Sequence, residues 1–140
     1  MPRRAFTILE LTVVLTIIGL VSAIAFPRLA DLRDSSSVRS ATADLGAEFS
    51  LARQTAITRR AAVAVVFDTV TGMIQLRSAG GILNQRSLGA VYGVVLGANR
   101  DSAIYDARGI GYGASNLSVT VRRGKIVDTL TMSRLGRVRW

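Results

Sequence analysis

Cysteine and histidine are both absent from the 140 residues of this chain. Without cysteine there can be no disulfide and no thiolate metal site. Without histidine the chain lacks the usual general base near neutral pH and the commonest metal ligand. A Ser-His-Asp or Cys-His nucleophile cannot form either, so few enzyme chemistries are open to this protein.

Acidic residues are also scarce. Nine Asp and Glu stand against 18 Lys and Arg, which gives a net charge of +9, and Lys125 is the only lysine. A basic surface favours anionic partners such as nucleic acid or lipid head groups, although charge alone does not choose between them. The hydrophobic content of 49% is high for a small soluble protein, so we expect part of the chain to meet lipid or another subunit.

The few acids do not build a convincing site. Asp31 with Asp34, and Asp101 with Asp106, could each pair as ligands for a hard cation. Solvated or helix-capping roles fit these four residues better. We therefore assign no catalytic residue, no metal and no cofactor from the sequence.

A long apolar run follows the first residues. Phe6 to Phe26 is 21 residues, about 31 Å as an α-helix, which matches a hydrocarbon core of roughly 30 Å. Arg3 and Arg4 precede the run, so the positive-inside rule predicts a cytoplasmic N-terminus and a single pass across the membrane.

Three interpretations of this segment compete. It could be a simple membrane anchor, or a secretory signal peptide, since 23–25 read Ala-Ile-Ala like a signal-peptidase site. Against the signal peptide, the apolar run is long and contains Glu10. The third interpretation is a prepilin leader, because a short basic stretch ends in the small residue Ala5 and is followed by Phe6-Thr-Ile-Leu-Glu10-Leu.

That hexapeptide resembles the FTLIEL start of mature type IV pilins and type II secretion pseudopilins. Glu10 is the fifth residue from Phe6, where the family has its glutamate, and Pro27 is the twenty-second, where many pilins have a helix-loosening proline. The family usually has glycine at the place of Ala5. The resemblance implies cleavage by a prepilin peptidase between Ala5 and Phe6, N-methylation of Phe6, and neutralisation of its amine by a neighbouring subunit's Glu10 during assembly.

Beyond the apolar run the pattern stays helical. Pro27 lacks an N–H and is expected to kink the helix, and the polar stretch 34–37 could restart it. From Phe6 to about Arg59 we expect one long, interrupted helix. Its second half carries one apolar face, made by Val38, Ala41, Leu45, Phe49, Ala52 and Ala56.

From residue 61 the apolar period changes to two, which indicates strands. The sequence 78–81 interrupts the pattern, and 99–116 is expected to be a loop region. The expected β segments are 61–68, 73–77, 88–96, a hairpin of 117–122 with 126–132, and an edge at 135–140. A helix face covered by antiparallel sheet is an α+β architecture.

The expected organisation therefore has four parts. Residues 1–5 are a leader peptide, 6–27 a transmembrane and assembly helix, 28–60 its amphipathic continuation, and 61–140 a C-terminal β domain. This order resembles the pseudopilin H and FimT family of minor pilins, and so do the helix end at 51–60 and the closing segment at 130–139.

The C-terminal residues 122–140 hold six basic side chains and a single acid, Asp128. Arginine suits phosphate better than lysine does, and Trp140 could stack on a base. The ending Gly-Arg137-Val-Arg139 resembles the GRxR ending of DNA-binding FimT-type minor pilins, which implies DNA contact at these two arginines. An equally open interpretation is that the genome is biased towards basic residues, and that these arginines are only the exposed face of an edge strand. The candidate DNA-binding residues are Arg122, Arg123, Lys125, Arg134, Arg137, Arg139 and Trp140.

The resemblance implies a minor pilin or pseudopilin that starts in the bacterial inner membrane and ends in a pilus or pseudopilus on the periplasmic or extracellular side. Its expected partners are other pilins or pseudopilins, prepilin peptidase and inner-membrane lipid. DNA uptake in natural transformation is the main alternative function. A membrane-anchored periplasmic binding domain outside any filament is the other.

Overall fold

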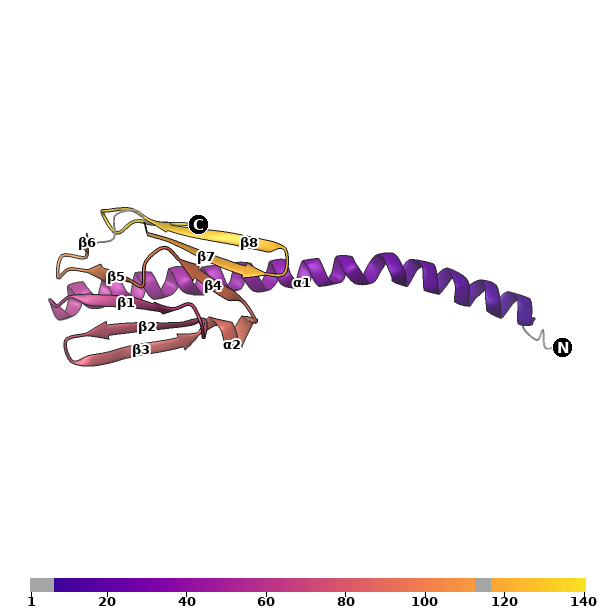
Figure 1. The fold of residues 1–140 in the computed structure, drawn as a ribbon, viewed down its shortest axis with the longest axis horizontal. Helices are drawn as coiled ribbons and strands as arrows, with labels where there is room; N and C mark the ends of the chain where they lie inside the picture. Colours follow the sequence, from indigo (N-terminus) through magenta and orange to yellow (C-terminus); the bar gives the residue numbers. More distant parts are fainter. Residues whose placement is uncertain (1–6, 113–116) are drawn as a thin grey trace, which may run out of the picture. The chain divides into compact units, whose positions relative to one another are not determined.

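The computed structural model describes residues 7–112 and 117–140. Within them the chain forms two compact units, Met1–Arg33 and Asp34–Trp140. One helix, α1 (Ile8–Arg59), contributes its first part to the first unit and its second part to the second unit. The order of the elements from α1 to β8 can be followed in Figure 1.

The first unit is helical from Ile8 onwards, and its large apolar side chains are exposed throughout. An 18-residue window of α1 has a mean hydropathy of 2.4 with none of it buried, so α1 is the one described helix that is long and apolar enough to cross a membrane. The helix continues through Pro27 and through 34–37. The expected interruption is therefore not observed: the rest of the helix outweighs the hydrogen bond that Pro27 removes from the ladder.

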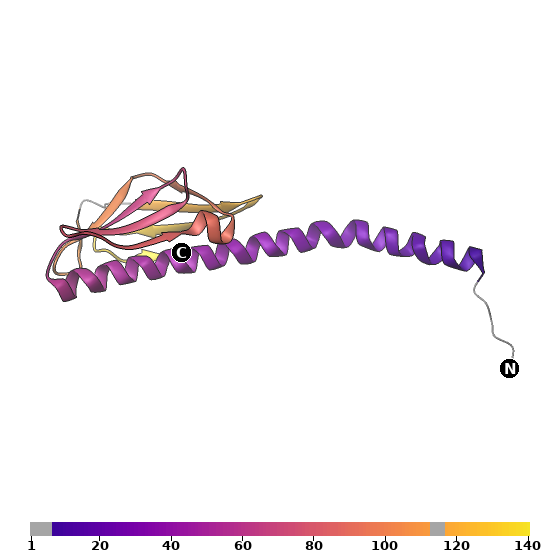
Figure 2. The ribbon, with the colours of Figure 1, turned by 90° about the horizontal axis from the view of Figure 1, so that it is seen from below.

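The second unit contains two antiparallel sheets. The larger sheet has the order β3-β2-β1-β5-β6, and the smaller has the order β4-β7-β8-β9. Figure 2 shows both on the same side of the second part of α1. The predicted α+β class is thus confirmed. The strands are β1 (Val63–Asp68), β2 (Met73–Ser78), β3 (Gly81–Ser87), β4 (Val95–Ala98), β5 (Ser102–Tyr105), β6 (Gly111–Tyr112), β7 (Leu117–Arg123), β8 (Ile126–Met132) and β9 (Val138–Arg139).

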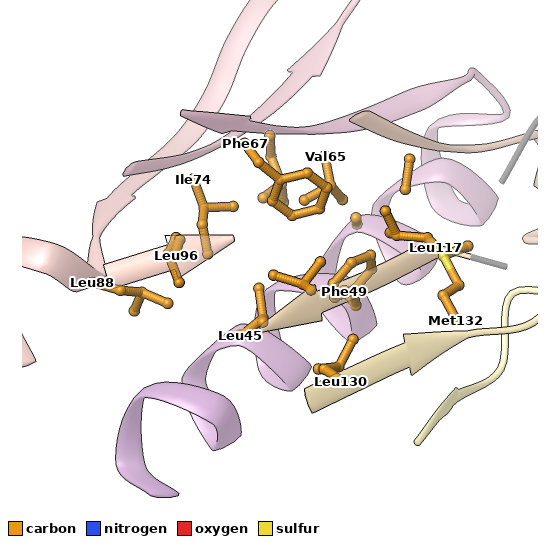
Figure 3. Packing of buried hydrophobic residues seen from close by; sticks show 14 of the residues in the cluster. Leu45, Phe49, Val65, Phe67, Ile74, Leu88, Leu96, Leu117, Leu130 and Met132 are labelled. Atoms are coloured by element: carbon orange, nitrogen blue, oxygen red, sulfur yellow. The ribbon is translucent and has the colours of Figure 1, made fainter. Parts of the chain in front are cut away.

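The core lies where α1 meets the inner faces of both sheets (Figure 3). The six positions of the predicted helix face are all at most 1% exposed, so this prediction is confirmed. Phe49 is at the centre, with its ring centroid 5.8 Å from that of Phe67 on β1. The smaller sheet covers the same helix with alternating side chains of β4, β7 and β8, namely Leu96, Leu117, Val119, Val121, Leu130 and Met132.

Several strand predictions are confirmed with shifted ends. The expected strand 61–68 begins at Val63, because Arg60 adopts a left-handed φ of 49° and Ala61 donates back to Ala56 O at 3.2 Å. The hairpin of 117–122 with 126–132 forms as β7 and β8. The expected edge at 135–140 forms as the two-residue β9 beside β8.

Between 78 and 116 the expected interruption is confirmed, whereas the expected strand 88–96 and the expected loop 99–116 were wrong. The interruption at 78–81 is a tight turn that leads into β3, an edge strand without alternating burial. The expected strand 88–96 begins instead with a short helix, α2 (Leu88–Tyr92), capped by Ser87 and ended by left-handed Gly93. The expected loop 99–116 contains β5 and β6, and its last four residues lie outside the described part of the chain.

Tyr105 on β5 gives the fold a measurable pH dependence. Its hydroxyl donates to the Gly136 carbonyl at 3.2 Å, and burial raises the pKa of Tyr105 to about 12. An unfolded tyrosine ionises near pH 10, so this stabilisation should be complete below about pH 10 and lost as the pH rises towards 12.

We therefore expect Tyr105→Phe to flatten the alkaline loss of stability. The measurement is the denaturant midpoint of the segment 34–140, which contains every buried core residue, at about pH 9 and about pH 11. The pKa of Tyr92 is also raised, chiefly by its hydrogen bond to Asp44, so part of the slope should remain. Equal alkaline losses in wild type and variant would contradict the assignment to Tyr105.

Candidate functional site

The first candidate site is the start of the helix. The Thr7 hydroxyl accepts a hydrogen bond from the Glu10 N–H at 3.2 Å, an N-terminal cap of the T-x-x-E kind. This capping role was not predicted, although the Thr-Ile-Leu-Glu sequence of residues 7–10 is its usual signature. Ala5 and Phe6, the predicted cleavage and methylation residues, lie outside the described part of the chain.

The Glu10 side chain is exposed on this helix. It forms no salt bridge with any described residue. By contrast, the hydroxyl of Thr12 donates to the carbonyls of Ile8 and Leu9 at 3.0 and 2.9 Å, and that of Thr16 donates to Thr12 O at 2.7 Å. The threonines are therefore satisfied inside the helix, as lipid requires, whereas the Glu10 carboxylate keeps its capacity for a partner.

The acidic side chains of the second unit are largely engaged in hydrogen bonds and ion pairs within the fold. Asp44 of α1 accepts from the Tyr92 hydroxyl at 2.6 Å and pairs with Arg86 of β3 at 2.7 Å. The buried Glu48 accepts from Asn84 Nδ2 at 3.0 Å on both oxygens. These contacts fasten β3 and α2 to the helix.

The predicted basic cluster is divided by the fold. Arg122, Arg123 and Lys125 lie at the β7–β8 turn, whereas Arg134 lies in the turn between β8 and β9. The seven residues of β8 separate these turns, a distance of roughly 20 Å at the rise of an antiparallel strand. The seven candidate residues therefore form two groups rather than one continuous site.

Arg123 is engaged in the fold itself. Its Nε donates to Asp34 Oδ1 at 2.8 Å, and its Nη1 donates to Ser37 Oγ at 3.1 Å and to the Tyr92 carbonyl. The side chains of Arg123 and Asp34 are each 26% exposed. This guanidinium thus ties the β7–β8 turn to α1 and to the end of α2, and it has few donors left for a phosphate.

We expect Arg123→Ala to destabilise the second unit by about 2 kcal/mol, because hydrogen bonds to charged groups contribute roughly 1.5–3 kcal/mol. The matched control is Arg122→Ala. That exposed side chain has one bond, to Gly124 O at 3.3 Å, and its loss should cost less than about 0.5 kcal/mol. Denaturant unfolding of residues 34–140 measures both, and equal effects would refute the anchoring role.

Arg137 and Arg139 are held at the other end of the smaller sheet. Gly136 has a left-handed φ of 76° in the β8–β9 turn. Ser133 closes this turn, since its N–H donates to Arg137 O at 2.8 Å and its hydroxyl accepts from Arg137 N at 3.2 Å. Val138 packs on the core between the two arginines, so the arginines themselves remain exposed.

The two arginines line two open grooves. One, of about 630 Å³, lies beside the ends of β7 and β8 and includes Ser118, Thr131 and Leu135. The other, of about 420 Å³, lies between β9 and α1 and includes Arg53 and Trp140. Among the predicted residues, the fold therefore brings together Arg137, Arg139 and Trp140, and it adds Arg53, which the sequence did not single out.

Comparisons with known proteins agree with this architecture. Residues 1–26 match the family model of the prokaryotic N-terminal methylation motif. No curated protein matches the sequence significantly.

Solved structures match the fold. The type IV minor pilin FimU of Pseudomonas aeruginosa is similar at 15% identity and a TM-score of 0.64, over 77% of this chain and 90% of that chain. The minor pseudopilin EpsH of the Vibrio cholerae type 2 secretion system is similar at 14% identity and a TM-score of 0.59, over 74% of this chain and 94% of that one. This protein is therefore type IV pilin-like: it has an N-terminal methylation motif, an exposed apolar helix and the fold of these minor pilins and pseudopilins.

Proposed function

We propose that the protein is a minor pilin or pseudopilin subunit and acts as a structural component rather than as an enzyme. Prepilin peptidase cleaves it between Ala5 and Phe6, and the new amine of Phe6 is N-methylated. The observation that carries the proposal is the match of residues 1–26 to the methylation motif, on a helix whose apolar side chains nothing in the described chain covers.

Burial of this helix against other subunits would drive assembly. Its exposed apolar side chains include Leu11, Leu15, Ile18 and Leu20, each more than half exposed. Removing such a side chain from water is worth roughly 1.5–3 kcal/mol, so outside the membrane the helix is stable only when other subunits cover it. Before assembly the inner membrane would cover the same side chains, with the N-terminus in the cytoplasm because of Arg3 and Arg4. The helix is continuous through Pro27 in the structure, and its loosening at Pro27 would occur only during this step.

Shearing of filaments tests the proposal. The chain is produced in a bacterium that has prepilin peptidase and a type IV pilus or type II secretion machine, beside Ala5→Arg and the control Ala5→Gly. Wild type and Ala5→Gly should be shortened and appear in the sheared filament fraction, whereas Ala5→Arg should stay full-length in the membrane. A wild-type chain that is never sheared off with filaments would support the anchored periplasmic domain instead.

DNA binding is a second candidate function. The observation that favours it is the convergence of Arg137, Arg139 and Trp140 on one groove, since guanidinium groups pair well with phosphate. In this function the subunit would display the β8–β9 end of its second unit to DNA outside the inner membrane. Arg122, Lys125 and Arg134 lie off this groove and would add only long-range attraction.

A further inference from the structure

The groove between β9 and α1 has an unusual lining. Three arginines contribute to it, Arg53 from the helix and Arg137 and Arg139 from the closing segment, together with Ser50 and Trp140. No acidic side chain lines it among the described residues, and none of the three arginines forms a salt bridge with a described carboxylate. Unpaired guanidinium groups on one groove favour an anionic ligand.

Trp140 is supported by the helix on one side only. A Cβ built on Gly46 would come within 2.8 Å of Trp140 Cζ3 and 3.1 Å of Cη2, so the indole lies directly against the helix where there is no side chain. The residue is nevertheless 65% exposed. A flat aromatic ring that is held from beneath and open above is a platform on which a base can stack.

The turn that precedes β6 contacts the side chain of Arg53 and fixes its position. The Cγ of Arg53 is 3.3 Å from a Cβ built on Gly109, so the aliphatic stem packs beside the turn that precedes β6. The positive charge of Arg53 is also near enough to Tyr105 to oppose the rise of that tyrosine's pKa. The stem is therefore held beside this turn, while the residue lines the groove and stays exposed.

We infer that this groove binds single-stranded nucleic acid, with Arg53, Arg137 and Arg139 on successive phosphates and one base stacked on Trp140. The inference rests on the second candidate function and adds Arg53 as a binding residue. A duplex presents its phosphates but hides the faces of its bases within the stack. The arginines can therefore contact either form of DNA, whereas the indole can add affinity only for a single strand.

The test uses the full chain in detergent micelles, with a labelled oligothymidine and a duplex of equal length at low salt. Anisotropy of the labelled DNA reports binding. Fluorescence of Trp140, the only tryptophan, reports stacking. The charge-matched control for Arg53→Ala is Arg59→Ala, an exposed arginine of the same helix that lies outside the groove.

Arg53→Ala should weaken single-strand binding at least about fivefold, and Arg59→Ala less than about twofold. Trp140→Leu should weaken single-strand binding about tenfold, within the range for one stacked base, and should leave duplex binding unchanged. Circular dichroism melting confirms that each variant is folded, and Arg53→Lys should restore part of the affinity.

Equal losses for Arg53→Ala and Arg59→Ala would overturn the inference, because they would indicate attraction by net charge alone. Trp140 fluorescence that does not respond to the single strand, or an absence of DNA binding, would overturn it as well. Duplex binding without a Trp140 response would overturn the single-strand inference and leave the second candidate function standing, whereas an absence of all DNA binding would remove both. None of these outcomes bears on cleavage before Phe6 or on recovery in sheared filaments.

Discussion

Replacing Glu10 with alanine or glutamine is expected to lower recovery of the protein in sheared filaments at least about tenfold, while cleavage before Phe6 continues. A carboxylate in the middle of a membrane costs roughly 2.5–3.5 kcal/mol, so its removal makes insertion easier rather than harder. A loss of assembly could therefore not result from failed insertion of the helix into the membrane. The loss of assembly would arise because the Phe6 amine of a neighbouring subunit no longer has the Glu10 carboxylate as its partner.

The control variants separate the charge from the local structure. Glu10→Asp keeps a carboxylate and should restore part of the assembly. Thr12→Val removes a hydroxyl that bonds only to carbonyls of its own helix, and it should assemble normally. Recovery of Glu10→Gln in filaments at the wild-type level, measured by immunoblot against the membrane fraction, would refute a role for this charge in assembly.

Phe49→Ala should have the largest effect on the stability of the second unit. The Phe49 side chain is fully buried where α1 meets both sheets (Figure 3). Truncating a buried phenylalanine costs about 3–5 kcal/mol, a large part of the total for a small domain. The matched control is Leu51→Ala on the same helix, where the side chain is 43% exposed and the expected loss is less than about 1 kcal/mol.

Urea unfolding of residues 34–140 followed by circular dichroism measures both variants. Similar losses for Phe49→Ala and Leu51→Ala would contradict the packing of α1 described above. If Phe49→Ala is too unstable to purify, Phe49→Leu, which keeps more of the buried volume, should still show a loss larger than that of Leu51→Ala.

Sequence periodicity predicted the parts of the fold in which one face is consistently buried. The helix face from Val38 to Ala56 and the β7–β8 hairpin alternate regularly, so their patterns identified them. The edge strand β3 shows no such alternation. The helix α2 depends on the cap at Ser87 and the left-handed Gly93, and β6 has only two residues. These elements depend on contacts that a local pattern does not contain.

The same distinction between local pattern and tertiary contact applies to the candidate sites. The N-terminal motif is contiguous in the sequence, so Glu10 and the cleavage position could be predicted directly. The basic cluster was predicted from composition, and composition did not indicate that β8 would separate Arg122 from Arg137. Nor could it place Arg53, 84 residues before Arg137, in the same groove, because that proximity arises only when β9 packs beside α1.

The most direct test of the central claim is the N-terminal sequence and intact mass of the mature chain isolated from a bacterium with prepilin peptidase. We predict that the chain begins at Phe6 and has the added mass of one methyl group. A chain that begins at Phe26 would mean secretion after signal-peptide cleavage, and one that retains Met1 would mean a plain membrane anchor. Either result would contradict the claim that this protein is processed as a pilin.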